Sequence, residues 1–176
     1  MRTVSAASAG CAALLMAAVL LADRPVAAQS GSAGAGSGTV AVEIEGAVQQ
    51  PLHLSAQDIE GLPAERVSAS YVTGHGQEQG DYTGVRLWTL LNRARLNDEP
   101  RRRDHLREVV TVTGRDGYAV VFSMGELDPD FEGKSVILAY RRNDQPLPES
   151  EGLRLVVPGD KHGGRYVRDV VRIEVK

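Results

Sequence analysis

Residues 153–165 read LRLVVPGDKHGGR, and they join a short apolar strand to a polar, glycine-rich loop. The strand ends at Pro158, because proline has no N–H to donate to a neighbouring strand. The glycines that follow allow backbone angles that other residues avoid. The loop also carries an acid, a lysine, a histidine and an arginine. We therefore expect a rigid strand that delivers a tight, cation-rich loop to the edge or end of a sheet.

The first 28 residues have the features of a cleaved secretory signal. An apolar run over residues 12–22 follows Arg2, and small residues precede the expected cleavage after Ala28. The run is shorter than the roughly 20 residues of a membrane span; a retained anchor is the alternative. Residues 29–38 consist almost entirely of Gly, Ser and Ala, and we expect a flexible linker there. The pattern predicts one domain over residues 39–176, in the periplasm or secreted.

The single cysteine and the slightly negative net charge exclude several classes of function. Cys11 is the only cysteine, and signal cleavage would remove it, leaving no disulfide, no thiolate nucleophile and no cysteine metal ligand. The net charge is −3, and the one dense basic run, residues 101–103, is flanked by acidic residues. This favours a solvated loop over a nucleic-acid-binding surface. No membrane span is expected after signal cleavage.

Alternation of apolar and polar residues predicts about eight short strands. Residues 51–54 are expected to be a short extended piece, residues 74–80 a polar turn, and Gly84 is expected to end the short strand before it. The apolar run 136–139 predicts a central strand that is buried on both faces. The expected strands are residues 40–45, 66–73, 81–83, 109–113, 118–122, 135–140, 153–157 and 166–175.

Two or three short helices are expected among these strands. Ser55 and Asp58 have the spacing of a helix-capping pair at the start of a brief helix. Leucines at helical spacing predict an amphipathic helix over residues 86–95, and a helical turn is expected at residues 124–127. Because strands and helices do not alternate regularly, the pattern predicts an α+β fold with mixed sheets of mostly short strands.

Blocks of residues along the whole domain, each weak alone, resemble sulfite-oxidase-type molybdopterin-binding domains in their joint order. The closest likeness is to small exported proteins that consist of this domain alone. The blocks are residues 42–48 with Pro51, residues 54–55, Ile59, residues 62–63, residues 82–87 with Leu90 and Leu91, residues 116–118, 138–139, 146–148, 152–159 and 166–168, and Ile173.

The resemblance implies an α+β fold and a molybdopterin cofactor that catalyses oxygen-atom or electron transfer. It also shows a departure from the family. In catalytic members a cysteine binds molybdenum, in the region that matches residues 67–80, and this sequence has no cysteine there. Ser68 or Ser70 could supply an alkoxide ligand, although oxygen is a harder ligand than the soft thiolate. We expect no counterpart here of the additional domain that full-length sulfite oxidases carry.

The loop after residue 158 is the candidate binding site for the anionic end of such a cofactor. Binding a phosphate needs cations, hydrogen-bond donors and close approach of the backbone. Lys161, Arg165 and His162 supply the first two, and Gly159 allows the third. Arg154 lies on the entering strand and could reach the same anion. The alternative is a surface loop whose cations are only solvated.

Two further residues are candidates near this site. Tyr118 follows an Asp-Gly pair, which is most simply a hairpin turn, and the resemblance implies that this element lies near the substrate. His75 lies in a glycine-bounded turn near the position of the missing metal ligand; the alternative is an exposed loop histidine. No catalytic residue is predicted. The four histidines show no paired spacing, so no metal site is predicted outside the cofactor.

Three functional hypotheses follow. The first is an exported molybdopterin-dependent oxidoreductase domain with a periplasmic redox partner. The second is the same fold without the cofactor, holding a small anion or a partner protein in the old cleft. The third rests on Gly46-Ala47-Val48 with Pro51, which resembles the start of ligand-binding β-grasp domains of polysaccharide export, and it explains only about fifteen residues.

Overall fold

A computed structural model describes residues 40–96 and 104–176 of the protein. The expected signal over residues 1–28, the linker over residues 29–38, Cys11 and the basic run 101–103 lie outside the described residues. No helix in the described ranges has the length and apolar character needed to cross a membrane.

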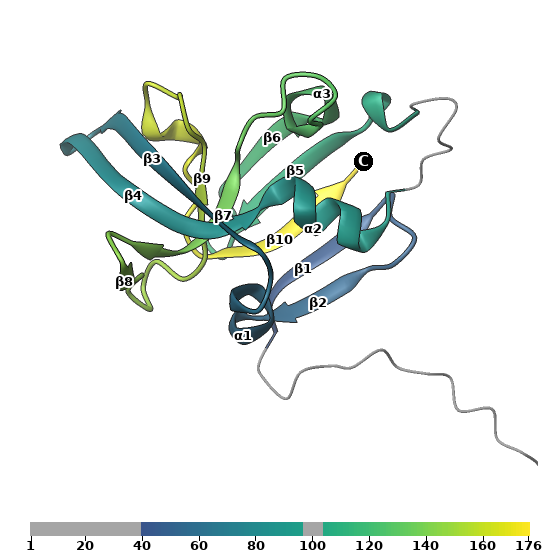
Figure 1. Ribbon diagram of the computed structural model, residues 1–176, viewed down its shortest axis with the longest axis horizontal. Helices are drawn as coiled ribbons and strands as arrows, with labels where there is room; N and C mark the ends of the chain where they lie inside the picture. Colours follow the sequence, from purple (N-terminus) through teal and green to yellow (C-terminus); the bar gives the residue numbers. More distant parts are fainter. Residues whose placement is uncertain (1–39, 97–103) are drawn as a thin grey trace, which may run out of the picture. The chain divides into compact units, whose positions relative to one another are not determined.

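The first sheet has five strands in the order β2-β1-β10-β5-β6 (Figure 1). The first and last strands of the domain, β1 and β10, pair in parallel, and the other neighbours are antiparallel. One face is apolar: Val42, Ile44 and Ile173 have no exposed surface. The bounds are β1 Val40–Gly46, β2 Leu52–Ser55, β5 Val109–Gly114, β6 Ala119–Ser123 and β10 Val170–Val175.

The second sheet is antiparallel and has β7 at its centre. β7 pairs with β4 on one side and with both β8 and β9 on the other, and β3 pairs with β4. The predicted central strand is confirmed, since Val136, Ile137, Leu138 and Ala139 are fully buried. The bounds are β3 Ala64–Thr73, β4 Gly76–Arg86, β7 Ile137–Arg142, β8 Gln145–Pro146 and β9 Arg154–Val156.

The helices are short and begin where the sequence predicts. Ser55 caps the first helix and exchanges hydrogen bonds with Asp58, as a capping box does. The second helix buries Leu87, Leu90 and Leu91 in the core. The bounds are α1 Ala56–Glu60, α2 Leu87–Ala94 and α3 Met124–Leu127, with 3-10 turns η1 at Asp104–Arg107 and η2 at Gly163–Arg165.

Local predictions were wrong at three places. The last strand, expected over residues 166–175, begins only at Val170, because Asp169 has φ +46° and interrupts the extended backbone. The stretch expected as a polar turn over residues 74–80 is mostly strand, because β4 runs without a break from Gly76 to Arg86 and only Gly74 and His75 form the turn. Gly84 does not end a strand. A Cβ atom at that position would lie 2.2 Å from the carbonyl oxygen of Leu138, so glycine lets β7 approach β4 closely. The glycine fits the neighbouring strand, which sequence pattern alone does not show.

The predicted fold class is confirmed: two mostly antiparallel sheets with three short helices make an α+β domain. Strand β9 and the loop after it lie beside the ends of β3 and β4 (Figure 1). The backbone N–H of Val72 at the end of β3 donates to the carbonyl of Lys161 at 2.9 Å. The loop within residues 153–165 therefore lies along the edge of β3 that does not pair with β4.

Candidate functional site

A cleft of about 470 Å³ lies where the end of β3 meets the η2 loop and the β5–β6 turn. We call it the η2 cleft. Its lining includes Tyr71, Asp116, Tyr118, Arg154, His162, Gly163, Gly164, Tyr166 and Arg168. A volume in this range is typical of small-ligand sites.

Two stacked tyrosines form the floor of the η2 cleft. The rings of Tyr71 and Tyr166 have centroids 3.8 Å apart, and both side chains are almost wholly buried. The Tyr166 hydroxyl donates to the carbonyl of Val157 at 2.8 Å, and burial raises the pKa of Tyr166 to about 12. The floor is therefore apolar in its rings and uncharged at neutral pH.

The η2 loop rests directly on this floor. A Cβ atom on Gly163 would lie 3.1 Å from Cδ2 of Tyr71, which is closer than most such contacts, so a side chain there would push the loop or the ring by a few tenths of an ångström. The hydroxyl of Tyr118 donates to the carbonyl of Gly164 at 2.6 Å and joins the β5–β6 turn to the same loop. Two separate elements thus hold the loop in place.

Two basic side chains of the η2 cleft are free to meet a ligand. Arg168 and His162 are exposed, and neither side chain forms an ion pair or hydrogen bond with another described residue. The one carboxylate in the lining is that of Asp116, whose Oδ1 accepts from the N–H of Tyr118 at 2.9 Å. The cleft therefore offers a guanidinium and an imidazole beside exposed glycine backbone.

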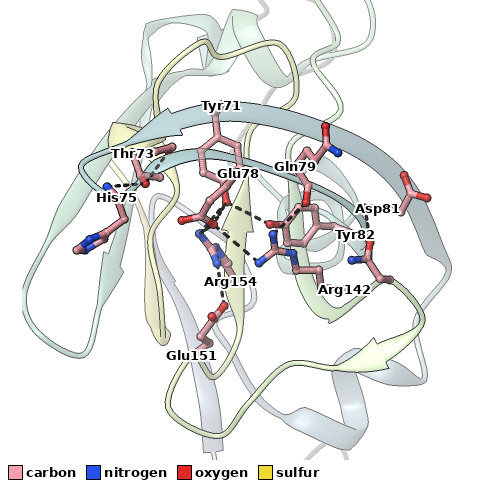
Figure 2. A network of polar contacts seen from close by, with 12 residues as sticks. Tyr71, Thr73, His75, Glu78, Gln79, Asp81, Tyr82, Arg142, Glu151 and Arg154 are labelled. Atoms are coloured by element: carbon pink, nitrogen blue, oxygen red, sulfur yellow. Dashed lines mark hydrogen bonds and ion pairs between the residues drawn. The ribbon is translucent and has the colours of Figure 1, made fainter.

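Arg154, expected to reach the anion, points into the protein instead (Figure 2). Only 2% of its surface is exposed. Its Nη1 donates to Glu151 at 2.8 Å, and its Nη2 donates to the hydroxyl of Tyr71 at 2.8 Å. The residue lines the η2 cleft from beneath, with its charge already matched by Glu151 and, at 3.7 Å, by Glu78.

Arg165, the second arginine of the predicted loop, is also paired. Its Nε and Nη2 donate to the two oxygens of Asp160 at 2.7 Å each, and its Nη1 donates to Glu126 at 3.0 Å. These hydrogen bonds with Arg165 lower the pKa of Asp160 and raise the pKa of Arg165. The guanidinium also lies over the ring of Phe122. Arg165 therefore ties the loop to α3 and does not line the cleft.

The remaining predicted residues are spread around the loop. His162 and Tyr118 line the cleft, whereas Lys161, Gly159 and His75 do not. Lys161 is exposed, and Gly159 has φ +86° in the turn after Pro158. His75 lies in the β3–β4 turn, where its N–H donates to the Thr73 hydroxyl, and its side chain points away from Arg154 (Figure 2).

The two serines considered as metal ligands face away from the η2 cleft. Ser68 and Ser70 lie on the opposite face of β3 from Tyr71 and line a separate polar hollow. The hydroxyl of Ser68 donates to Asp81 at 2.6 Å. In the described ranges, no group of three or more His, Cys, Asp or Glu side chains could hold a metal ion.

Sequence reasoning did not single out Arg168, Asp116, Tyr71 or Tyr166 as site residues. A signal existed for Arg168 and Tyr166, because both lie in a block quoted for the family resemblance. Tyr71 shares the inward face of β3 with Val67 and Ala69, so its pattern is that of a core residue. Its place beneath a cleft depends on the η2 loop, which is distant in sequence.

Comparison with known proteins found a matching family and similar solved structures. The family model of the oxidoreductase molybdopterin-binding domain matches residues 35–176. The crystal structure of the sulfane dehydrogenase SoxCD from Paracoccus pantotrophus is similar, with a TM-score of 0.65 and 21% sequence identity. The match covers 83% of this chain but 40% of that chain, so this chain spans less than half of its length. No curated protein matches.

The family match extends over far more of the chain than the short likeness to β-grasp domains of polysaccharide export, which rested on about fifteen residues. At 21% identity, the similarity to the solved structure establishes the fold. The ligand of the cleft is determined by the residues that line it.

Proposed function

Because this chain belongs to the oxidoreductase molybdopterin-binding domain family, we propose that it is a binding module that holds a small anionic ligand of the pterin class in the η2 cleft. Members of the family typically bind molybdopterin, whose anionic end and flat ring are the features that this cleft would recognise.

One observation carries the proposal: Arg168 and His162 face the cleft without a partner in the described part of the chain. A guanidinium can form a forked, charge-assisted pair with a phosphate or carboxylate, and an imidazole adds a donor. The loop cations that do not line the cleft are either paired, as Arg165 is, or exposed, as Lys161 is. The anion would therefore lie against Arg168.

The residues present fit the organic part of molybdopterin better than its metal. Arg168 and His162 would hold the phosphate, and the exposed ring of Tyr118 offers a flat surface to the pterin. A soft thiolate for molybdenum is absent from the described residues, since Cys11 is the only cysteine of the chain. When bound in the family, the cofactor supplies oxygen-atom or electron transfer.

Fluorescence titration with 6-carboxypterin, which combines the ring with one carboxylate, tests the proposal. We expect saturable binding, competition by inorganic phosphate, and at least tenfold weaker binding in Arg168→Gln. Arg172→Gln is the matched control, because Arg172 is an exposed arginine of β10 outside the cleft. Equal affinity of wild type and Arg168→Gln for both probes would refute the proposal.

A second candidate function is oxygen-atom or electron transfer by bound molybdopterin, and the family match over residues 35–176 favours it. It expects molybdenum and pterin in near-equal amounts in protein purified from the native host. Metal-free protein that cannot be loaded with cofactor would contradict it and leave anion binding in the cleft. Export to the periplasm, and a redox partner there, belong to this candidate and are tested by fractionating the cells.

A further inference from the structure

Arg154 lines the η2 cleft, but its guanidinium N–H groups donate to protein groups and not into the cleft. Its two terminal nitrogens are engaged by Glu151 and by the hydroxyl of Tyr71, each at 2.8 Å. Its third nitrogen, Nε, has no partner and no exposed surface. An arginine held at both ends of its fork is fixed in place. Arg154 therefore stabilises the residues beneath the cleft and does not bind a ligand in it.

The contact that matters is the hydroxyl of Tyr71, whose hydrogen-bonding capacity is fully used (Figure 2). It accepts from Arg154 and donates to Glu78 at 3.1 Å. Because a phenol has a single proton, the hydroxyl of Tyr82, 3.1 Å away, acts as donor to Tyr71. Burial raises the pKa of Tyr71, so the phenol stays protonated at neutral pH. Three partners thus fix the ring.

The ring of Tyr71 in turn sets the position of the η2 loop. It stacks on Tyr166 at 3.8 Å, and Gly163 packs against its edge. The next residue, Val72, donates its backbone N–H to the carbonyl of Lys161. A shift of the ring would therefore move the segment that carries His162. Contacts lead without interruption from Arg154 through Tyr71 to the loop.

We propose that Arg154 is a positioning residue that acts through the hydroxyl of Tyr71 to hold the η2 loop in its binding geometry, without touching the ligand itself. This inference rests on the proposed binding function of the cleft. It assigns separate roles to two arginines of one site: Arg168 contacts the anion, and Arg154 places the loop beside it.

Binding of 6-carboxypterin to Tyr71→Phe, Arg154→Lys and the double variant tests the pathway. Lysine keeps the charge but loses the fork, so each single variant should weaken binding about fivefold, the worth of one hydrogen bond. The double variant should also bind about fivefold more weakly, because both changes break the same link. Tyr140→Phe is the matched control, since its hydroxyl has no hydrogen bond among the described residues and lies outside the cleft.

Salt dependence separates support from direct contact. Screening weakens a ligand's attraction to each cation that it faces. The plot of log Kd against log salt concentration should be shallower in Arg168→Gln and unchanged in Arg154→Lys, Arg154→Gln and Tyr71→Phe. A shallower plot in Arg154→Gln would overturn the proposal, because Arg154 would then face the anion. Independent, multiplying effects of Tyr71→Phe and Arg154→Lys would overturn it as well.

Amide hydrogen exchange at Val72 provides a readout that needs no ligand. Its N–H is protected by the hydrogen bond to Lys161, so exchange reports whether the loop stays on β3. We expect exchange about tenfold faster in Tyr71→Phe and Arg154→Lys, and unchanged in Arg168→Gln. Unchanged exchange in the first two variants would overturn the inference. If wild type binds neither probe, the proposed function fails, and this exchange measurement still decides the role of Arg154.

Discussion

The Arg154 cluster and the Arg165 cluster both surround an arginine with two carboxylates, but they lie in different environments. We define the first as Arg154 with Tyr71, Tyr82, Glu78 and Glu151, and the second as Arg165 with Asp160, Glu126 and Lys134. Side-chain exposure is 2% for Arg154 and 31% for Arg165. Water therefore screens the second cluster much more than the first.

The difference shows that charge alone does not identify a ligand-binding arginine. Both residues were expected to bind an anion, and both are matched by carboxylates of the chain itself. The two clusters differ in what they stabilise: the buried Arg154 cluster fixes a tyrosine under the cleft, and the half-buried Arg165 cluster ties the loop to α3. Arg168, which has no such partner among the described residues, is left for a ligand.

The largest expected effect is on the buried cluster. Arg154→Met should lower the free energy of unfolding by about 3 kcal/mol, because it leaves Glu151 without its cation and leaves Glu78 with only Arg142, at 3.8 Å, in a mostly buried place. The value is at the lower end for buried pairs, since the two carboxylates are partly exposed. Urea unfolding measures it. A loss no greater than that of Arg172→Met, an exposed arginine, would show that burial does not distinguish the clusters.

A smaller loss is expected at the second cluster. Arg165→Gln removes a forked pair with Asp160 and a hydrogen bond with Glu126, and should cost about 1–2 kcal/mol after allowance for solvent screening. Arg115→Gln is the control, because Arg115 pairs with Asp169 but is 67% exposed. Equal losses in the two variants, measured by urea unfolding, would mean that the Arg165 cluster behaves as an ordinary surface pair.

The same cluster predicts a pH dependence. Hydrogen bonds with Arg165 lower the pKa of Asp160 from 3.8. Burial opposes a fall in the pKa of Glu126, but Arg165 and Ser123 outweigh it, so this pKa also lies below 4.5. A lowered carboxylate pKa stabilises the fold above the unfolded value, and this contribution is lost as pH falls through the folded value. The stability gap between wild type and Arg165→Gln should therefore shrink from pH 6 to pH 3. A constant gap would contradict this.

The smallest effect on stability is expected at Arg168. Arg168→Gln should change the free energy of unfolding by no more than about 0.5 kcal/mol, because the exposed side chain has no ion pair in the described part of the chain. Thermal unfolding without ligand checks this. A larger loss would assign Arg168 to the scaffold and weaken its role in binding.

Elements governed by local contacts were predicted well. The capping pair Ser55 and Asp58 lies within one turn, and the alternation over β1 reflects one buried face, so both were visible in sequence. The prediction at Gly84 was wrong because the reason for that glycine is the close approach of Leu138, which is distant in the chain. A glycine in a strand pattern can mark either the end of the strand or the close approach of a neighbouring strand, and only the position of that neighbour distinguishes the two.

At the site, the sequence predicted the right loop and only some of the right side chains. His162, Tyr118 and Arg154 line the η2 cleft, whereas Lys161, Arg165, Gly159 and His75 do not. A side chain's availability depends on the carboxylates and rings that fold against it. Besides the nearby Glu151 and Asp160, Arg154 is held by Tyr71 of β3 and Arg165 by Glu126 of α3, and no sequence spacing reveals these two distant pairings.

By itself, the sequence determined the order of the main strands, the helix caps, the glycine-rich loop after Pro158, and the lack of any cysteine beyond Cys11. These follow from short-range patterns and from composition. Only the tertiary structure decided which arginine faces the cleft, because the partners that hold Arg154 and Arg165 include residues distant in the chain, Tyr71 and Glu126. In the folded chain Arg154 points inward and donates to Tyr71, and Arg165 pairs with Asp160 and Glu126. Arg168 remains exposed and lines the cleft with His162.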